Sequence, residues 1–316
     1  MPTLERITIF PVKSLDGMEV PEARVQYSGA LEHDRRWQVV DMEGRVVNAK
    51  RTPLVHAIRA EFDLDGAGVA GARPGPGANV VSLAVDQGAL AAAAVPGLAR
   101  LAALGPASFP LLPGADGPCE WLAEALGERV LLVERADGGF PDDRDAPGPT
   151  VAATATLVEV ARWFGFDLAE SRRRFRVNLE IGGCDAFWED TLASPARPEL
   201  QPSLAGLSDA LPADPYAGLP PPEPRDFTVG PVRLRATNVC RRCAVPGRDS
   251  RTGAVTAHFR DAFEARRARG LRQDVDASAW SHLYRLAVNT RLVGPISAGV
   301  ALHNVAAGQA VDAVPG

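Results

Sequence analysis

The chain has 316 residues, of which 46% are hydrophobic and 23% charged, and its formal net charge is −5. This composition is typical of a globular protein long enough for one large domain or two. It holds no run near the roughly 18 apolar residues of a membrane span, its first residues do not resemble a signal peptide, and its negative charge gives no general attraction to nucleic acid. We therefore expect a cytoplasmic protein with reduced cysteines that binds neither nucleic acid nor a membrane.

The first hundred residues are predicted to be mainly β. Alternation of apolar and polar residues predicts strands at residues 4–10, 36–40, 45–49, 55–62 and 80–85, the second and third of them as a hairpin. Pro11 ends the first strand, and residues 12–17 are expected to turn. The glycine- and proline-rich residues 65–78 predict a mobile loop.

The remaining residues mix helices with strands. Helices are predicted at residues 119–126, 154–165, 258–269 and 277–287, the second capped by Thr154 and ended by Gly165. Strands are predicted at residues 129–134, 175–181, 291–293, 299–303 and 310–314. Residues 137–150 form a polar crossing, and residues 191–226 a long proline-rich irregular insertion. The expected fold class is therefore α+β, mainly β, with a few helices.

The clearest chemical motif is Cys240-Arg-Arg-Cys243, at the end of an alternating segment. A thiolate is a soft metal ligand and a nucleophile, and neighbouring guanidinium groups keep it ionised and attract anions. These surroundings suit a metal carried on a negatively charged organic group.

Two other uses of a Cys-x-x-Cys pair stay open at this point. A zinc site needs four ligands, and the sequence offers only a set such as Cys184, His258, Cys240 and Cys243. A thioredoxin-like pair should open a helix after a strand, but the next residues, Ala244-Val-Pro-Gly, predict a turn.

The basic residues are almost all arginine: of 34, only Lys13 and Lys50 are lysine. A lysine that survives such a bias can offer a phosphate the compact point charge that arginine lacks. Chance is the alternative explanation for both. Lys50 or its neighbour Arg51 is also a candidate cation at the rim of a site.

Several short motifs, taken in order, carry a resemblance to a known family. They are Phe10-Pro-Val-Lys-Ser14, Asp34-Arg-Arg-Trp37, Arg174-Phe-Arg-Val-Asn178, Gly183-Cys-Asp185, and Cys240-Arg-Arg-Cys243 with Asp249 and Thr252-Gly253 after it. In these the chain resembles MOSC-domain proteins with a MOSC N-terminal β-barrel domain, the group that includes the mitochondrial amidoxime-reducing component. The resemblance implies a β-barrel-like domain over residues 1–115 and a MOSC β-barrel over residues 116–316.

The same resemblance implies a molybdenum cofactor, Mo-molybdopterin, whose metal is held by a phosphorylated pterin and one protein thiolate. By motif position Cys243 is that thiolate and the catalytic residue. Arg241 and Arg242 would offset the charge of the pterin and the metal. Cys240 is expected to be a small buried side chain.

Further residues are expected to hold the pterin itself. Lys13 and Ser14 would meet its phosphate, one with charge and the other with a hydroxyl donor. Arg35 would join them, the alternative being a surface ion pair with Asp34 or Glu32. On the predicted strand at residues 175–181, Arg176 and Asn178 would point to the same face and bind the pterin; a plain exposed strand face is the alternative.

The resemblance also implies an activity, the two-electron reduction of N-hydroxylated compounds such as hydroxylamines and amidoximes to amines. Such a molybdenum-dependent oxidoreductase takes a small-molecule substrate. It would need a separate electron-donor reductase or ferredoxin-type protein, because the four cysteines do not form the run of an iron–sulfur cluster. The alternatives are a cofactor carrier or sulfur-handling protein without turnover, and a zinc-binding structural protein. A full sulfurase is disfavoured because no second, pyridoxal-phosphate-dependent domain is found in the sequence.

Overall fold

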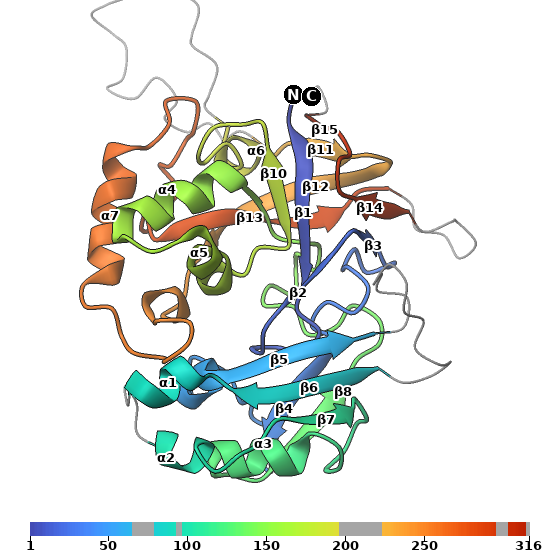
Figure 1. The fold of residues 1–316 in the computed structure, drawn as a ribbon. Helices are drawn as coiled ribbons and strands as arrows, with labels where there is room; N and C mark the ends of the chain where they lie inside the picture. Colours follow the sequence, from blue (N-terminus) through green and yellow to red (C-terminus); the bar gives the residue numbers. More distant parts are fainter. Residues whose placement is uncertain (65–78, 93–96, 196–222, 295–302, 314–316) are drawn as a thin grey trace, which may run out of the picture.

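The computed structural model describes residues 1–64, 79–92, 97–195, 223–294 and 303–313. In the view of Figure 1, a large curled sheet with helices on one side lies above a smaller group of strands and short helices. Strands and helices are mixed in both parts. This arrangement confirms the predicted α+β class.

The large sheet has, within the described residues, the strand order β15-β11-β12-β13-β9-β10-β1-β2. In chain order these strands are β1 (Thr3–Ile9), β2 (Met18–Val20), β9 (Val151–Ala153), β10 (Leu179–Gly182), β11 (Asp226–Val229), β12 (Val232–Arg241), β13 (Arg285–Leu292) and β15 (Val311–Ala313). The sheet curls until its two sides meet. The backbone N–H of Leu4 donates to the Gln309 carbonyl at 2.9 Å, and that of Val311 to the Pro2 carbonyl at 3.0 Å.

The smaller group contains an antiparallel sheet and a separate strand pair. The sheet consists of β5 (Ile58–Asp63), β6 (Val80–Val85) and β7 (Ala107–Pro110), while β4 (Trp37–Asp41) pairs with β8 (Val130–Glu134). A further pair, β3 (Glu22–Arg24) with β14 (Asn304–Ala306), lies beside the large sheet (Figure 1). The helices of the smaller group are α1 (Gln87–Ala92), α2 (Leu98–Leu101), α3 (Cys119–Leu126) and the 3-10 helix η1 (Pro53–Ala57). The domain boundary between residues 115 and 116 stays a prediction; β8, which follows it, pairs with β4.

One hydrophobic core runs through both parts. In β1 the buried residues are Leu4, Ile7 and Ile9, as expected for a strand with a single apolar face, although a register shift follows Leu4. Trp37 of β4 and Leu83 of β6 belong to the same cluster. Because side chains of different sheets share one core, the two parts of the fold are packed firmly against each other.

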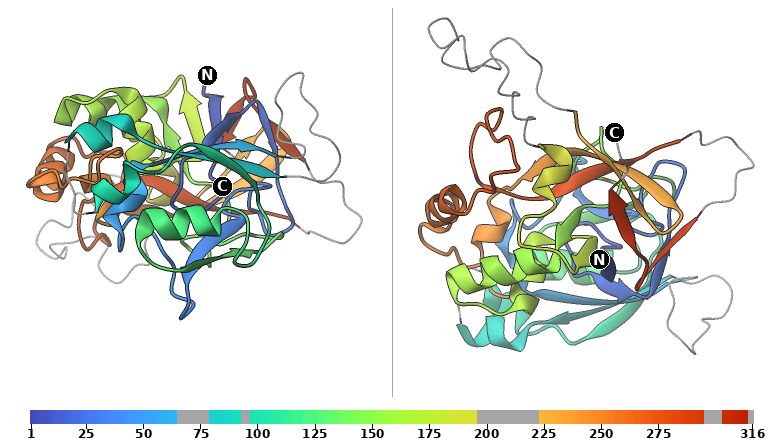
Figure 2. Two further views of the ribbon diagram at one scale, coloured as in Figure 1. Left: turned by 60° about the horizontal axis from the view of Figure 1, so that its bottom comes forward. Right: turned by 90° about the horizontal axis from the view of Figure 1, so that it is seen from above.

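The remaining helices lie to one side of the large sheet, as the view from above shows most clearly for α4 and α7 (Figure 2). They are α4 (Thr154–Phe164), α5 (Leu168–Phe175), α6 (Asp190–Ala193), α7 (Phe259–Arg269) and the 3-10 helix η3 (Val245–Gly247). Beneath them is a second cluster in which the Phe263 ring meets the edges of Trp163 at 5.4 Å and Tyr284 at 5.2 Å. Phe175, the last residue of α5, is fully buried in this cluster. The aromatic packing therefore fixes the end of α5.

The predicted strand at residues 175–181 is wrong at its start. Phe175 still belongs to α5, Arg176 ends that helix in the left-handed region with φ 51°, and β10 begins only at Leu179. The sequence held a signal for the missed helix. Asp167 accepts a hydrogen bond from the Glu170 N–H at 2.6 Å, and Asp followed three residues later by Glu is a typical helix start.

The predicted helix at residues 277–287 is also wrong. Arg285 begins β13, which pairs with β12 over most of its length, so sheet pairing overrides the local apolar spacing. The predicted cap of α4 is wrong because its cap is Ala153, while the Thr154 hydroxyl donates to Glu5 Oε2 at 2.6 Å. Two strands are corrected as well: residues 55–57 belong to η1, and in the described chain only Val46 of residues 45–49 forms a bridge, with Val40.

Some predicted segments cannot be compared with the structure. The loop at residues 65–78, most of the insertion at 191–226 and nearly all of the strand at 299–303 lie outside the described residues. The parts of the insertion that are described contain α6 and the first residue of β11. Among the described residues, no helix has both the length and the apolar character needed to cross a bilayer.

A buried carboxyl group below β9 leads to a prediction about pH. Glu189 Oε2 accepts hydrogen bonds from the Ala153 N–H at 3.1 Å and the Thr156 hydroxyl at 3.0 Å. Burial and the neighbouring Asp190 raise the pKa of Glu189 from 4.5 to about 8. Between these values the folded chain keeps a proton that the unfolded chain has released, so the free energy of unfolding falls as the pH rises.

Glu189→Gln is therefore expected to flatten the pH dependence of stability. The difference in slope should be on the order of 1 kcal/mol per pH unit between about pH 5 and pH 8. Urea unfolding of both proteins across this range measures it. Equal slopes in the variant and the wild type would contradict the assignment of this proton to Glu189.

Candidate functional site

A cavity of about 1280 Å³ opens between the large sheet and the smaller group. Both parts of the fold line it, for example through Thr8 of β1, Arg59 of β5 and Arg241 of β12. All the predicted site residues except Asn178 lie in its wall, namely Lys13, Ser14, Arg35, Arg176, Arg241, Arg242 and Cys243. The structure thus gathers residues that are far apart in the sequence.

The cavity is strongly basic. Fourteen arginine and lysine side chains line it, against five aspartate and glutamate side chains. His56 adds no positive charge near pH 7, because burial and then the nearby Arg248 lower its pKa to about 4. A concave surface with this excess of positive charge attracts and concentrates anions.

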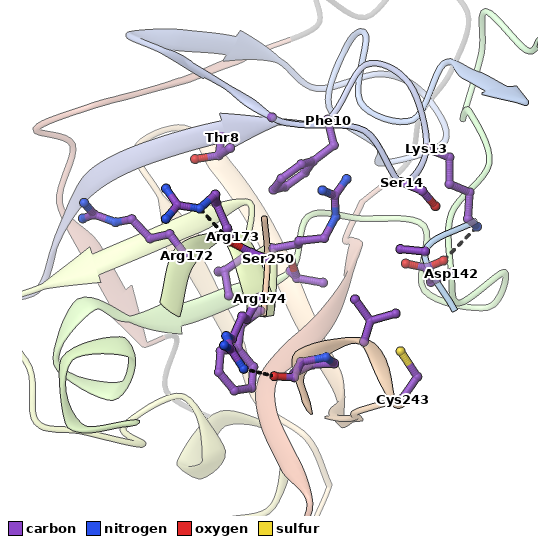
Figure 3. A pocket seen from close by; sticks show the side chains of 18 of the residues that line it. Thr8, Phe10, Lys13, Ser14, Asp142, Arg172, Arg173, Arg174, Cys243 and Ser250 are labelled. Atoms are coloured by element: carbon purple, nitrogen blue, oxygen red, sulfur yellow. Dashed lines mark hydrogen bonds and ion pairs between the residues drawn. The ribbon is translucent and has the colours of Figure 1, made fainter. Parts of the chain in front are cut away.

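Lys13 and Ser14 lie in the turn that follows β1. The Lys13 N–H donates to the Trp37 carbonyl at 2.8 Å, which ties the turn to β4, and Ser14 has a left-handed φ of 76°. The Lys13 ammonium group donates to the Phe140 carbonyl at 3.0 Å and pairs with Asp142 at 2.8 Å. Figure 3 shows Lys13 reaching toward Asp142, with Ser14 beside it.

Asp142 is a site residue that the sequence analysis missed. It comes from the polar crossing at residues 137–150, where no pattern distinguishes one carboxylate from another. Desolvation in the cavity would raise the pKa of Asp142, but the attraction of Arg35 and Lys13 outweighs it and lowers the pKa to about 2. The Asp142 carboxylate is therefore the present anionic partner of Lys13 and Arg35, the cations that are predicted to hold a phosphate.

Arg35 forms one of the ion pairs considered for it and also lies in the cavity wall, while its contact with a phosphate stays a prediction. It pairs with Asp34, and it also lines the cavity, with its Nε 3.8 Å from Asp142. Glu32, the other expected partner, lies 3.7 Å from Arg24 instead. Burial would lower the pKa of Arg35, but Asp34 and Asp142 raise it above its ordinary value, so the guanidinium stays charged.

Arg176 is a cation of the cavity wall that is held by a ring and a carbonyl group. Its guanidinium stacks on the Phe10 ring at 4.1 Å and donates to the Leu15 carbonyl at 2.7 Å. Among the described residues, no carboxylate forms an ion pair with it. Burial and the like charge of Arg35 lower its pKa to about 10. An anion bound in the cavity would offset both effects.

Asn178 lies behind the cavity wall and is almost fully buried. Its side-chain amide donates to the Thr8 carbonyl and to Asp34 Oδ1, each at 3.0 Å, and its oxygen accepts from the Thr150 hydroxyl at 3.0 Å. These bonds use its polar atoms within the protein. Asn178 is placed to position Asp34, and through it Arg35.

The two cysteines of the motif differ in exposure. Cys240 is buried, its thiol donates to Asn289 Oδ1 at 2.9 Å, and burial raises its pKa to about 11, although Arg242 acts in the opposite direction. Cys243 is exposed at the cavity, beyond the end of β12. The expected burial of Cys240 is confirmed, and Cys243 is the accessible thiol.

The two arginines between these cysteines also differ. Arg242 donates to the Phe175 carbonyl and packs over the Phe175 ring at 5.5 Å. Arg241 is exposed, and in the pairing of β12 with β13 it stands opposite Arg285. Burial and the charge of Arg241 lower the pKa of Arg285. Three guanidinium groups thus surround the segment that carries Cys243.

The alternative uses of the cysteine pair find no support. The described residues contain no group of three or more His, Cys, Asp or Glu side chains arranged to hold a metal ion. Cys184 donates instead to the Ile181 carbonyl at 3.5 Å, and the ring of His258 lies 3.9 Å from Asp261. The chain after Cys243 turns into η3, so the pair does not open an α-helix. The described residues support neither the zinc site nor the thioredoxin-like site.

The far end of the cavity was not predicted either. In the view of Figure 3, Arg172 and Arg173 lie on the opposite side from Lys13 and Cys243. Arg173 donates to the Ser250 hydroxyl at 2.8 Å, and Arg172 pairs with Glu180 at 2.8 Å.

Of the two residues considered as a rim cation, Lys50 does line the cavity. Arg51 does not, and it forms ion pairs with Asp41 and Glu128 instead.

Parts of this chain are similar to known proteins. Residues 1–103 match the family model of the MOSC N-terminal beta barrel domain, so the chain carries the domain that its motifs predicted. Three similar relatives are molybdenum cofactor sulfurases of fruit flies. Those of Drosophila erecta and Drosophila yakuba are 28% identical over 198 residues, and that of Drosophila melanogaster is 28% identical over 200 residues.

Each match covers 60% of this chain and 24% of the relative, so the chain spans about a quarter of the length of these proteins. These relatives are named for the molybdenum cofactor. The closer likeness to the mitochondrial amidoxime-reducing component stays a prediction.

Proposed function

We propose that this protein is a molybdenum-dependent oxidoreductase that reduces N-hydroxylated compounds to amines. The observation that supports it most is the exposed Cys243 thiol at the edge of a basic cavity of about 1280 Å³. The reaction balances as R–NH–OH with two electrons and two protons giving R–NH₂ and water, and the electrons come from a separate flavin or iron–sulfur protein. When bound, a molybdopterin cofactor would supply the two-electron redox chemistry.

The residues present fit this cofactor. Its phosphate needs cations and N–H or O–H donors, and the turn with Lys13 and Ser14 offers a charge, a hydroxyl and a backbone N–H in an unusual conformation. Arg176 is a partly buried cation with no carboxylate partner in the described chain, and a bound anion would neutralise it. Cys243 offers the soft thiolate that a high-valent metal accepts.

Each residue has a separate task in this proposal. Lys13 and Arg35 bind the phosphate, and the phosphate replaces Asp142 as their anionic partner. Arg176, stacked on the Phe10 ring, would offset the negative charge of the bound cofactor. Arg242, fixed on the Phe175 carbonyl, offsets negative charge next to Cys243. Asn178 keeps Asp34 and Arg35 in place from behind.

Electron supply gives the test of this proposal. The glycines Gly66, Gly68 and Gly71 have the spacing of a dinucleotide-binding turn but lie outside the described residues. The flanking strands β5 and β6 pair antiparallel, whereas that fingerprint requires a parallel βαβ unit. We therefore do not expect NADH or NADPH to serve as direct electron donor.

Purified, molybdenum-loaded protein is accordingly expected to reduce an amidoxime with reduced viologen but not with NADH or NADPH alone. Formation of the corresponding amidine, followed by chromatography, measures both reactions. Turnover with NADH and no partner protein would contradict the prediction. Metal analysis of the same sample distinguishes the oxidoreductase from a zinc-binding structural protein, because zinc in place of molybdenum would favour the structural protein.

A second function has support from the comparisons. The relatives are named molybdenum cofactor sulfurases, and the match covers 24% of their length. The matched region of this chain could bind or pass on the pterin, or handle sulfur, without reducing a substrate. Failure of the viologen reaction in a sample fully loaded with molybdenum would favour this carrier function.

A further inference from the structure

Arg241 and Arg285 form an unusual pair at the wall of the cavity. They stand directly opposite each other where β12 pairs with β13, and Arg241 is two residues before Cys243 in the sequence. Like charges in this position destabilise a sheet unless an anion lies between or beside them. None of the ion pairs formed among the described residues involves either side chain. Arg285 donates only to backbone carbonyl groups, to Val239 at 2.8 Å and to His282 at 3.1 Å.

The groups predicted to hold the cofactor phosphate lie elsewhere. Lys13 and Arg35 belong to the first part of the chain and share Asp142 as partner. Arg242 is held by the Phe175 carbonyl. Arg241, in contrast, is exposed, and the structure holds no partner for it among the described side chains. Arg241 is therefore available for an additional anion close to Cys243. Arg285 is nearly buried and lies 5.5 Å from the Trp280 ring, so it contributes mainly its positive charge from the cavity wall.

We propose that Arg241 and Arg285 form an anion subsite that binds a carboxylate or phosphate group of the substrate. This inference rests on the proposed function and names its substrate class: N-hydroxylated compounds that carry a negative charge. A guanidinium group binds two oxygens of a carboxylate or phosphate at once, so the subsite would also orient the compound. The anion relieves the repulsion between Arg241 and Arg285, and the basic cavity raises its local concentration.

The test compares an uncharged aryl amidoxime with its para-carboxylate and para-phosphonate analogues in the viologen reaction. Because Arg241 was also expected to offset the charge of the cofactor, Arg241→Gln is judged by the difference between compounds. It is expected to lower kcat/KM for the charged compounds about tenfold more than for the uncharged compound, mainly through KM. Rates are expressed per bound molybdenum so that cofactor loss is not counted. The matched control is Arg291→Gln, an exposed arginine on β13 that does not line the cavity. An equal loss for all three compounds would overturn the subsite.

A binding measurement separates the subsite from the proposed function. Calorimetric titration of the molybdenum-loaded protein with an aryl carboxylate and an aryl phosphonate that lack the N–O group needs no turnover. Arg241→Gln should weaken the binding of at least one of them about tenfold, and the ligand with the larger loss identifies the preferred anion. If no compound is reduced but this loss is found, the subsite stands and the reductase function fails. Binding that does not depend on Arg241 overturns the subsite.

Discussion

Cys243→Ser is expected to give a folded protein that reduces N-hydroxylated compounds at least roughly 100-fold more slowly than the wild type and has a depleted or altered molybdenum site. A hydroxyl group is a poor substitute for a thiolate as ligand of a soft, high-valent centre. The fold should not suffer, because Cys243 is exposed and belongs to neither hydrophobic cluster. Metal analysis, viologen-driven turnover and thermal unfolding measure the three properties separately.

Cys240→Ser is the matched control for this experiment. Cys240 is buried in the cluster beneath the helices, and its thiol donates to Asn289. Serine can keep that hydrogen bond, so molybdenum content and turnover should change little while the melting temperature falls slightly. Equal molybdenum content and turnover in Cys243→Ser and the wild type would rule out Cys243 as the ligand.

Lys13→Ala is expected to weaken retention of the cofactor. It removes a charge-assisted contact worth roughly 1.5–3 kcal/mol, which corresponds to about ten- to a hundredfold in affinity. Removal also leaves Asp142 without the partner that now lies 2.8 Å away, and this carboxylate would then repel a phosphate. The loss should grow with salt concentration, since the side chain is partly exposed. Pterin release after dilution or gel filtration measures it.

Lys50→Ala is the control, because Lys50 is the other lysine of the chain and lines the same cavity. It is exposed, and no described carboxylate pairs with it. It contributes to the general positive charge without belonging to the turn after β1. If the two variants release the pterin equally, the assignment of Lys13 to the phosphate and the argument from the scarcity of lysine both fail.

Strands that bury one face were predictable from the sequence, because alternation of apolar residues reports burial directly. β1, β6 and β8 lie within one residue of the predicted positions. The segment at residues 277–287 was misread, since its apolar residues fit a helix locally. What makes Arg285 part of a strand is its neighbour β12, more than forty positions earlier in the sequence, and no local pattern contains that information.

The candidate site was predictable only as a set of residue types. Motif order suggested that Lys13, Arg35, Arg176 and Cys243 belong together, and the structure places all four at one cavity. Geometry could not be foreseen: Arg176 reaches the cavity from the left-handed end of α5 and not from a strand. The same holds for Asp142, which matters only because the polar crossing returns next to Lys13.

The pairing of β1 has a consequence for the order of events during synthesis. Its neighbours in the sheet include β10, and Leu4 is bound to Gln309. Lys13 and Cys243 are separated by 230 positions in the sequence. A growing chain therefore exposes the turn with Lys13 long before its wall is complete, and contacts of such long range form slowly. We therefore expect any cofactor to be loaded late, after the residues that pair with β1 have been made and the cavity wall has formed.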